Sequence, residues 1–293
     1  MSGRNPMTDV TAVILTKNEE KNLIDCLESL KGFAKRTVVV DCGSEDGTCS
    51  IAEEYGADVY FHPFENYSKQ FNWALDNTDI TTKWTYRLDA DERLTPALKE
   101  ELAALALEHA DDDINGFSTE AWLVFLGRVL KHGAANKRRI VMFKTGIGRI
   151  EDRRMDEHTV LSEGKSISCK ERFIHEDFKD MTHWINKMNW YATREMQDYF
   201  EFKEGKSAEI ENDRYVAETR RKKFGFYYKL PMFSRSWFLF VYYYIFKGGF
   251  LDGRPGYIFN YMYHRWYRNL VDTKIYEQML NPKPFEETGD LKQ

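Results

Sequence analysis

Short apolar runs alternate with amphipathic stretches along the first part of this chain. Runs of β-branched and other apolar residues at 10–15, 36–40 and 58–61 have the length and composition of buried strands. Between the first two runs, leucines recur at helical spacing over residues 20–30, and a second helical stretch covers residues 48–55. Strands that alternate with helices predict a parallel sheet with helices on both faces. We therefore expect an α/β fold.

The same alternation continues further along the chain. The additional elements expected are helices at 68–75, 96–108 and 181–202, and strands at 84–88, 116–126 and 138–143. After the last of these helices begins, aromatic and basic residues become frequent. We expect an α/β domain over residues 1–180 and a helical extension over residues 181–293.

Polar clusters follow three of the expected strands, at residues 16–20, 41–47 and 89–92. In an open α/β sheet, the loops at the carboxyl ends of the strands form the ligand crevice, so these clusters are expected to meet at one edge. Asp89 and Asp91 are two residues apart and therefore project from one face of a strand end. Carboxylates placed in this way can bind Mg²⁺ or Mn²⁺ that bridges two phosphates. The alternative is a solvated turn before the next helix.

The composition is that of a folded intracellular protein. With 293 residues and 42% hydrophobic content, the chain can form one large domain or two modest ones. Its four cysteines show neither CxxC pairing nor metal-ligand spacing, which fits a reducing compartment. The first nine residues lack the apolar stretch of a signal peptide. We therefore expect a cytoplasmic location.

Positive charge and aromatic rings are concentrated near the carboxyl-terminal end. The net charge is −5, yet residues 214–275 contain twelve Lys or Arg against three Asp or Glu, a local charge of +9. Nineteen aromatic residues lie between Phe224 and Tyr267. This combination predicts contact with an anionic membrane surface, at the inner face of the cytoplasmic membrane. The alternative is an aromatic helix that packs on the α/β domain.

Two other interpretations of this segment are not favoured. Its longest apolar run, ten residues at 237–246, is shorter than the ~20 residues that span a bilayer. No recognition motif accompanies the basic charge, so nucleic-acid binding is not expected.

Three motifs resemble those of the family 2 glycosyltransferases, which are inverting enzymes of the GT-A fold, and the resemblance covers roughly residues 8–180. The motifs are Val13-Ile-Leu-Thr-Lys-Asn-Glu19, Val39-Val-Asp-Cys-Gly-Ser-Glu-Asp-Gly-Thr48 and Leu88-Asp-Ala-Asp-Glu92. Later segments resemble the branch that builds lipopolysaccharide core, capsular and exopolysaccharide units. These segments are Met155-Asp-Glu-His158, His175 and Gly249-Phe-Leu-Asp-Gly253.

The resemblance implies a nucleotide-binding half at about residues 8–110 and an acceptor half at about residues 111–180. It implies transfer of a sugar from a nucleotide-sugar donor, UDP-linked, to a saccharide or lipid-linked saccharide acceptor. It also implies a requirement for Mg²⁺ or Mn²⁺.

Individual residues receive roles from the resemblance. The nucleotide-binding set that it implies is Thr16, Asn18, Glu19, Asp41, Lys69, Asp89 and Arg139. Asp41 would accept the imide N–H of uracil, a donor that cytosine lacks, and otherwise is a cap or turn residue. Lys69 and Arg139 would contact phosphates, or else are surface cations. Asp91 would bind the metal, and His175 would be a further metal ligand or else a buried structural histidine.

Inverting transfer requires a carboxylate that removes the proton of the acceptor hydroxyl. The family pattern places this base at the end of a short acidic motif, which implies Glu157, with Asp156 as the alternative. The carboxylate pair here precedes His158 and departs from the commoner Glu-Asp order.

Two other functions compete with this one. A nucleotidyltransferase shares the alternating strands and the metal carboxylates, but a glycine-rich basic loop is expected after its first strand, and Thr16-Lys-Asn-Glu-Glu20 contains no glycine. A catalytically silent scaffold at the membrane could retain the fold, but intact Asp89, Asp91 and Glu157 argue against a decayed site.

Overall fold

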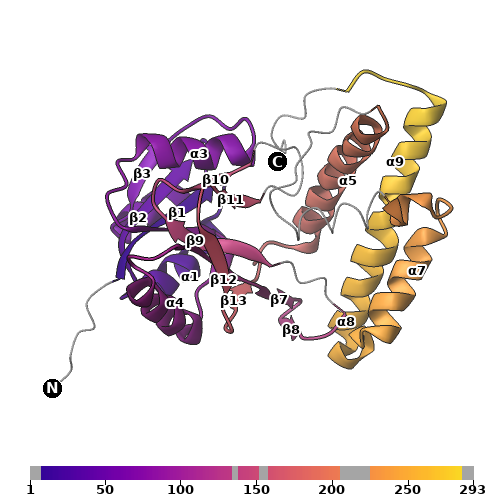
Figure 1. Cartoon of the computed structure of the whole chain (residues 1–293). Helices are drawn as coiled ribbons and strands as arrows, with labels where there is room; N and C mark the ends of the chain where they lie inside the picture. Colours follow the sequence, from indigo (N-terminus) through magenta and orange to yellow (C-terminus); the bar gives the residue numbers. More distant parts are fainter. Residues whose placement is uncertain (1–7, 134–137, 152–157, 205–224, 286–293) are drawn as a thin grey trace. The chain divides into compact units, whose positions relative to one another are not determined.

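The computed structural model describes residues 8–133, 138–151, 158–204 and 225–285 (Figure 1). The chain forms two compact units. The first comprises residues 1–124 and 136–179, and the second comprises residues 125–135 and 180–293. The longer segment of the second unit, residues 180–293, begins one residue before the helical extension expected at residues 181–293. The shorter segment, residues 125–135, was expected in the α/β domain.

A seven-stranded sheet forms the centre of the first unit. Its strands are β1 (Thr8–Thr16), β2 (Ala34–Asp41), β3 (Asp58–Phe61), β4 (Trp84–Asp89), β6 (Ile114–Thr119), β9 (Arg139–Lys144) and β12 (Lys165–Ser168). The order is β12-β6-β9-β4-β1-β2-β3. Strand β9 is antiparallel to both of its neighbours, and the other neighbouring pairs are parallel. The expected α/β class is confirmed, with a mostly parallel sheet in place of a wholly parallel one.

Helices cover both faces of this sheet, as the alternation of elements predicted. They are α1 (Glu20–Leu30), α2 (Thr48–Glu54), α3 (Tyr67–Asn77) and α4 (Pro96–Glu108). Successive residues of β1 point to opposite faces, so that Ala12 and Ile14 pack in the cluster with α1, α2 and α4, whereas Val13 packs in the cluster with α3. Figure 1 shows α3 above the sheet and α1 and α4 below it.

Local sequence explains where two of these helices begin. The side chain of Thr95 accepts a hydrogen bond from the Leu98 backbone N–H, and Pro96 occupies the first turn of α4. The side chain of Asn66 caps α3 in the same way, through the N–H of Lys69. The bounds of α4 are those predicted from the sequence, because both a cap and a proline mark its start.

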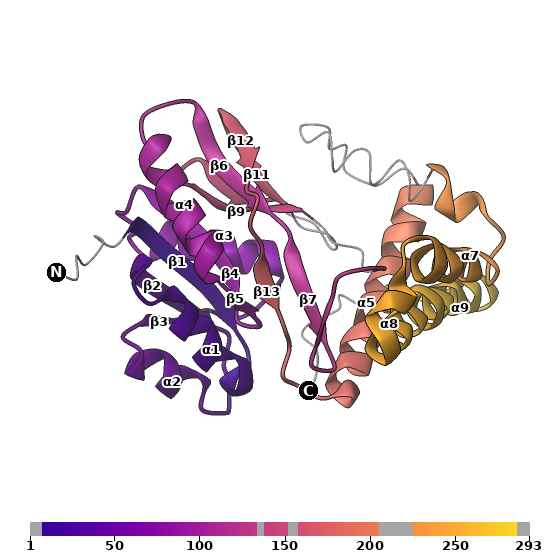
Figure 2. The same ribbon diagram turned by 90° about the horizontal axis from the view of Figure 1, so that it is seen from below.

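Smaller strands pair beside the main sheet. They are β5 (Glu92–Arg93), β7 (Ala121–Phe125), β10 (Gly148–Ile150), β11 (Thr159–Leu161) and β13 (Phe173–His175). Strand β13 pairs with β5 on one side and with β7 on the other (Figure 2), and β10 pairs with β11. The single strand expected at 116–126 is two strands, β6 and β7, which join different sheets.

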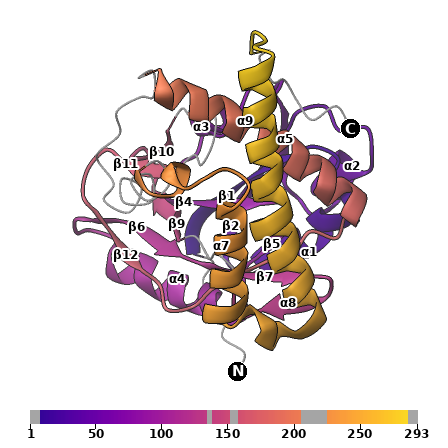
Figure 3. The same ribbon diagram turned by 90° about the vertical axis from the view of Figure 1, so that its right-hand side faces the viewer.

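The second unit is mainly helical. Its elements are β8 (Arg128–Leu130), α5 (Met181–Lys203), η1 (Tyr227–Lys229), α7 (Arg235–Val241), η2 (Tyr242–Phe246), η3 (Gly249–Asp252), α8 (Gly253–Asn260), η4 (Tyr261–Tyr267) and α9 (Arg268–Leu280). Figure 3 shows α9 beside α7, with α5 crossing behind α9. Met188, Ala192 and Met196 of α5 share a core with Val271 and Ile275 of α9.

Two buried polar groups hold the helices of this unit together. Asp272 accepts hydrogen bonds from the Arg235 side chain and from the backbone N–H of Phe233. Glu195 accepts hydrogen bonds from the Tyr267 hydroxyl at 2.7 Å and from Arg268 at 2.7 Å. A buried carboxylate is stable only when charged or polar partners replace water, and each of these carboxylates has them.

None of the helices in the described residues is both long enough and apolar enough to span a membrane.

Leu98 and Leu107 offer a matched test of the core, since both are in α4 and differ in burial. Leu98 is 0% exposed and Leu107 is 82% exposed. We expect Leu98→Ala to lower the free energy of unfolding by about 2–5 kcal/mol, because it removes buried methyl groups and leaves a cavity. Leu107→Ala should change it by less than about 0.5 kcal/mol. Urea denaturation followed by tryptophan fluorescence measures both values, and equal losses would contradict the packing of α4.

Candidate active site

The ends of three strands bring the polar clusters together at one edge of the sheet. Strand β1 pairs with β2 in a register that puts Thr16 opposite Asp41, and with β4 in a register that puts Leu15 opposite Asp89. All three strands are parallel, so the loops that follow them lie at the same edge. The sequence analysis predicted this grouping.

Asp41 organises the loop that follows β2. One carboxylate oxygen accepts hydrogen bonds from the backbone N–H groups of Gly43 and Ser44, each at 2.7 Å. The other accepts from the hydroxyls of Thr16 at 2.8 Å and Ser44 at 2.5 Å. Burial raises the pKa of Asp41, but the donors from Ser44, Thr16 and Gly43 outweigh burial and hold the pKa below its ordinary value. Its contact with uracil stays a prediction.

The loops after β1 and β2 are fastened to each other. Asn18 has a left-handed backbone, with φ +51°, and its side chain accepts a hydrogen bond from the N–H of Glu45. Its own N–H donates to the Ser44 hydroxyl at 2.7 Å, and Lys17 donates to the carbonyl of Gly43 at 2.6 Å. The predicted nucleotide loop is therefore one ordered surface built from two strand ends.

An acidic cluster follows β4. Oxygen atoms of Asp89, Asp91 and Glu92 all lie within 4.8 Å of one another. Carboxylate oxygens are the ligands that Mg²⁺ and Mn²⁺ prefer in proteins. The sequence analysis gave roles to Asp89 and Asp91 but none to Glu92, which is the most buried of the three.

Arg139 of β9 is the cation at the acidic cluster. Its guanidinium donates to Asp89 Oδ2 at 3.1 Å and to Glu92 Oε2. The Tyr67 hydroxyl donates to Asp89 Oδ1 at 2.7 Å and accepts from Arg87 Nε at 2.9 Å. Asp89 is therefore fixed on both oxygens. Arg139 was predicted to contact phosphate, and its partners among the described residues are carboxylates, so the phosphate contact stays a prediction.

Burial and charge act in opposite directions on these carboxylates. Burial raises the pKa of Asp89, but Arg139 and Arg87 outweigh it, so the net shift is downward. Glu92 is more deeply enclosed, and burial raises its pKa although Arg139 opposes the shift. The cluster contains three carboxylates, and the guanidinium of Arg139 is bonded to two of them. Arg139 therefore balances only part of the negative charge at this edge of the sheet.

His175 lies beside the acidic cluster, as the sequence suggested. In the pairing of β13 with β5 it stands opposite Glu92, and its Nε2 is 3.1 Å from Asp91 Oδ2. The backbone N–H of Glu176 donates to the carbonyl of Asp91 at 2.9 Å. His175 and Asp91 therefore lie in contact, and metal binding by His175 stays a prediction.

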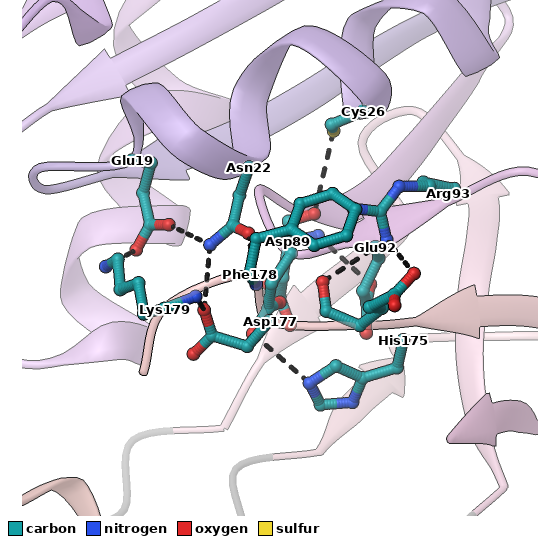
Figure 4. A network of polar contacts seen from close by, with 12 residues as sticks. Glu19, Asn22, Cys26, Asp89, Glu92, Arg93, His175, Asp177, Phe178 and Lys179 are labelled. Atoms are coloured by element: carbon teal, nitrogen blue, oxygen red, sulfur yellow. Dashed lines mark hydrogen bonds and ion pairs between the residues drawn. The ribbon is translucent and has the colours of Figure 1, made fainter. Parts of the chain in front are cut away.

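The segment after β13 is tied to the loop after β1 (Figure 4). Asn22 donates to Asp177 at 3.0 Å and accepts from the N–H of Phe178 at 2.8 Å, and it also donates to Glu19 at 2.8 Å. Lys179 donates to the other oxygen of Glu19 at 2.7 Å. Burial raises the pKa of Glu19 against the effect of Lys179. Glu19 was predicted to hold the ribose, and that contact is untested.

Sequence reasoning missed Asn22, Tyr67 and Lys179. Asn22 could have been identified from the sequence, because it is a polar residue on the buried side of an amphipathic helix, next to Leu23. A buried amide needs hydrogen-bond partners, so a residue at such a position is expected to connect neighbouring segments. No local pattern marks Tyr67 or Lys179, since their partners are distant in the sequence: Asp89 and Arg87 for Tyr67, and Glu19 for Lys179.

Lys69 lies on the surface of α3. It forms an ion pair with Glu65 one turn earlier, and about half of each side chain is exposed. A phosphate contact by Lys69 stays a prediction.

The predicted catalytic bases, Asp156 and Glu157, lie outside the described residues. The residues on either side are tied together, because the N–H of Glu151 donates to the carbonyl of His158 at 3.0 Å. The His158 ring also contacts the Glu151 carboxylate at 2.9 Å.

Comparison with known proteins agrees with the geometry. Residues 11–145 match the family described as Glycosyl transferase family 2. The lipopolysaccharide core biosynthesis glycosyltransferase LpsC of Rhizobium meliloti is 28% identical over 93% of this chain and 94% of LpsC. An uncharacterized glycosyltransferase of Rickettsia felis is 33% identical, over 36% of this chain and 37% of its own length.

Solved structures give a more distant match. Glucosyl-3-phosphoglycerate synthase from Mycobacterium tuberculosis, in complex with Mn²⁺, UDP and glucosyl-3-phosphoglycerate, is 19% identical. The match covers 40% of this chain and 44% of the synthase, with a TM-score of 0.31, which is too low to add to the argument. The sequence matches and the arrangement of the strand ends agree in identifying residues 11–145 as a domain of the glycosyltransferase family 2 type.

Proposed function

We propose that this protein transfers a sugar from a UDP-sugar to a saccharide or lipid-linked saccharide acceptor, in the synthesis of lipopolysaccharide core or a related surface polysaccharide. The observation that carries the proposal is the acidic cluster of Asp89, Asp91 and Glu92 beside the two interlocked loops. The similarity to LpsC over nearly the whole length of both chains supports the lipopolysaccharide assignment.

The acidic cluster fits a divalent cation by its chemistry and by its charge. Its ligand atoms are carboxylate oxygens, and Arg139 balances only part of their negative charge. When bound, Mg²⁺ or Mn²⁺ would neutralise the diphosphate leaving group as the sugar departs. Asp91 is the best placed ligand, because Arg139 and Tyr67 bond the two oxygens of Asp89, and the Glu92 side chain is 2% exposed against 15% for Asp91.

The remaining residues of the cluster position these ligands. Arg139 and Tyr67 fix the two oxygens of Asp89, and Glu92 accepts a hydrogen bond from the Asp89 backbone N–H at 3.0 Å. His175 faces Asp91 from the neighbouring strand, where it orients the carboxylate or joins it as a ligand.

Transfer with inversion is a single displacement. The acceptor hydroxyl loses its proton to a carboxylate, its oxygen bonds to the anomeric carbon, and the bond from that carbon to the diphosphate breaks. The family resemblance supports Glu157 as the base, with Asp156 as the alternative.

Asp91→Asn tests the metal site. The amide keeps the shape of the side chain but loses the charge that holds a cation, so we expect metal-dependent transfer to be abolished. Mn²⁺-dependent binding of UDP in calorimetry and hydrolysis in a panel of nucleotide sugars measure the effect. Asp113→Asn is the matched control, since Asp113 is an exposed carboxylate paired only with Lys165 among the described residues. Normal Mn²⁺ dependence in Asp91→Asn would remove Asp91 from the site.

Asp41→Ala tests the uracil contact. We expect UDP binding to weaken by about 1.5–3 kcal/mol, the usual cost of losing a hydrogen bond to a charged group. The unmutated protein should bind UDP more tightly than CDP in calorimetry, because only uracil offers an N–H at that position. Ser44→Ala is the control: it removes hydroxyl contacts that order the loop and keeps the carboxylate. An equal loss in both variants would assign Asp41 to loop structure alone.

Glu157→Gln tests the base. Turnover should fall roughly 100-fold or more while UDP binding is unchanged, since general-base assistance contributes on that scale. If Asp156→Asn lowers turnover in this way and Glu157→Gln does not, the order of the two candidates is reversed.

A further inference from the structure

Large apolar side chains are exposed along one stripe of the second unit. In α7 and η2 they recur in pairs every four residues, which places them on one side of the continuous helix. These side chains are Trp237, Phe238, Val241, Tyr242, Ile245 and Phe246. The adjoining segments η3 and α8 add Phe250, Leu251 and Tyr257, and the start of η4 adds Tyr261. We call these ten residues the aromatic face; each is between 40% and 76% exposed.

The other side of the same helix is packed. The ring of Phe240 packs edge-on against the rings of Tyr257 and Tyr261, with 6.4 Å and 6.1 Å between ring centroids. The rings of Tyr244 and Phe250 pack in the same way, with 6.3 Å between centroids. These contacts join α7–η2 to η3–α8, so that the two parts of the aromatic face adjoin. A recess of about 420 Å³ lies between them, and Arg254 is one of the residues that line it.

Only positive charge is exposed in this part of the chain. Between residues 225 and 276 the sequence has two carboxylates, Asp252 and Asp272, and both are buried, at 2% and 0% exposure. Asp252 accepts hydrogen bonds from His132, and Asp272 is paired with Arg235. Lys229, Lys247 and Arg254 are exposed. Within residues 225–276, the surface therefore offers rings and cations without an accessible carboxylate.

We propose that the aromatic face docks in the interface of an anionic lipid bilayer. Tyrosine and tryptophan favour the depth of the lipid headgroups, where the ring is in an apolar layer and its polar atom is hydrated. Phenylalanine, isoleucine and leucine side chains enter the acyl boundary, and the flanking cations meet lipid phosphates. This inference rests on the chemistry of the face and is independent of the proposed reaction.

Charge favours a bilayer over a second copy of the chain. A symmetric dimer through this face would set the same patch against itself. Lys247 and Arg254 would then face cations of the same kind, with no carboxylate on the face to neutralise them. An anionic bilayer supplies that negative charge.

Flotation of the full-length protein with vesicles tests the proposal. We expect binding to an equimolar mixture of phosphatidylcholine and phosphatidylglycerol, much weaker binding to phosphatidylcholine alone, and loss of binding as salt is added. Equal binding to the two compositions, or no binding to either, would overturn the proposal.

Two variants with matched controls locate the contact. Phe246→Ser should lower the partition coefficient about ten-fold, since it removes a side chain that is 76% exposed in solution and buried in lipid. Leu107→Ser, at a residue that is 82% exposed in the first unit, should leave it unchanged. The double variant Lys247→Ser/Arg254→Ser should lower the partition coefficient roughly five-fold for each cation removed. The control double variant Lys165→Ser/Lys170→Ser, in the first unit, should change the partition coefficient little.

Two further measurements separate the alternatives. Light scattering that shows a dimer dissociated by Phe246→Ser, without vesicle binding, would assign the face to a second copy and overturn the proposal. UDP binding by calorimetry should be the same in all these variants. Failure of the membrane contact is thereby distinguished from failure of the proposed reaction, which is tested at Asp91 and Asp41.

Discussion

The pairing of Arg139 with Asp89 and Glu92 is the interaction on which the arrangement of the site depends. Asp89, Asp91 and Glu92 lie within four consecutive residues, and gathering their charges at one sheet edge is unfavourable without a cation. Arg139 begins β9, and β9 is antiparallel to β4, so the start of one strand lies at the end of the other. A parallel β9 would have placed Arg139 at the opposite edge. The one reversed strand of the central sheet is thus the strand that carries the cation to the carboxylates.

The sheet that contains β5, β13 and β7 extends this arrangement toward the loop after β1. Pairing of β13 with β5 brings His175 to Asp91, and the residues that follow β13 reach Asn22 and Glu19. The acidic edge and the loop after β1 are therefore joined through hydrogen bonds as well as through the main sheet. A shift of either would break contacts in the other, which favours a preorganised site.

The sequence predicted what depends on local patterns. Strand β3 and helix α4 have the expected bounds, and the three polar clusters meet where parallel strands end. It could not predict what depends on pairing between distant segments. The direction of β9 and the division of residues 116–126 between two sheets follow from partners that no local pattern reveals. For the same reason the pairing of Arg139 with carboxylates about fifty residues earlier could not be predicted from the sequence.

The separation of about fifty residues between Arg139 and its carboxylate partners affects how this edge of the sheet forms. Strands β1, β2, β3 and β4 are contiguous in the chain apart from their connecting helices, and the loops after β1, β2 and β4 already carry the polar clusters of this edge. Arg139 arrives only when a loop of about fifty residues closes, a step whose entropic cost grows with loop length. Until β9 docks, the first four strands hold their carboxylates without their guanidinium. The charge balance of this edge therefore depends on a long-range contact, and a chain that ends before β9 would keep all three carboxylates of the acidic cluster yet lack Arg139.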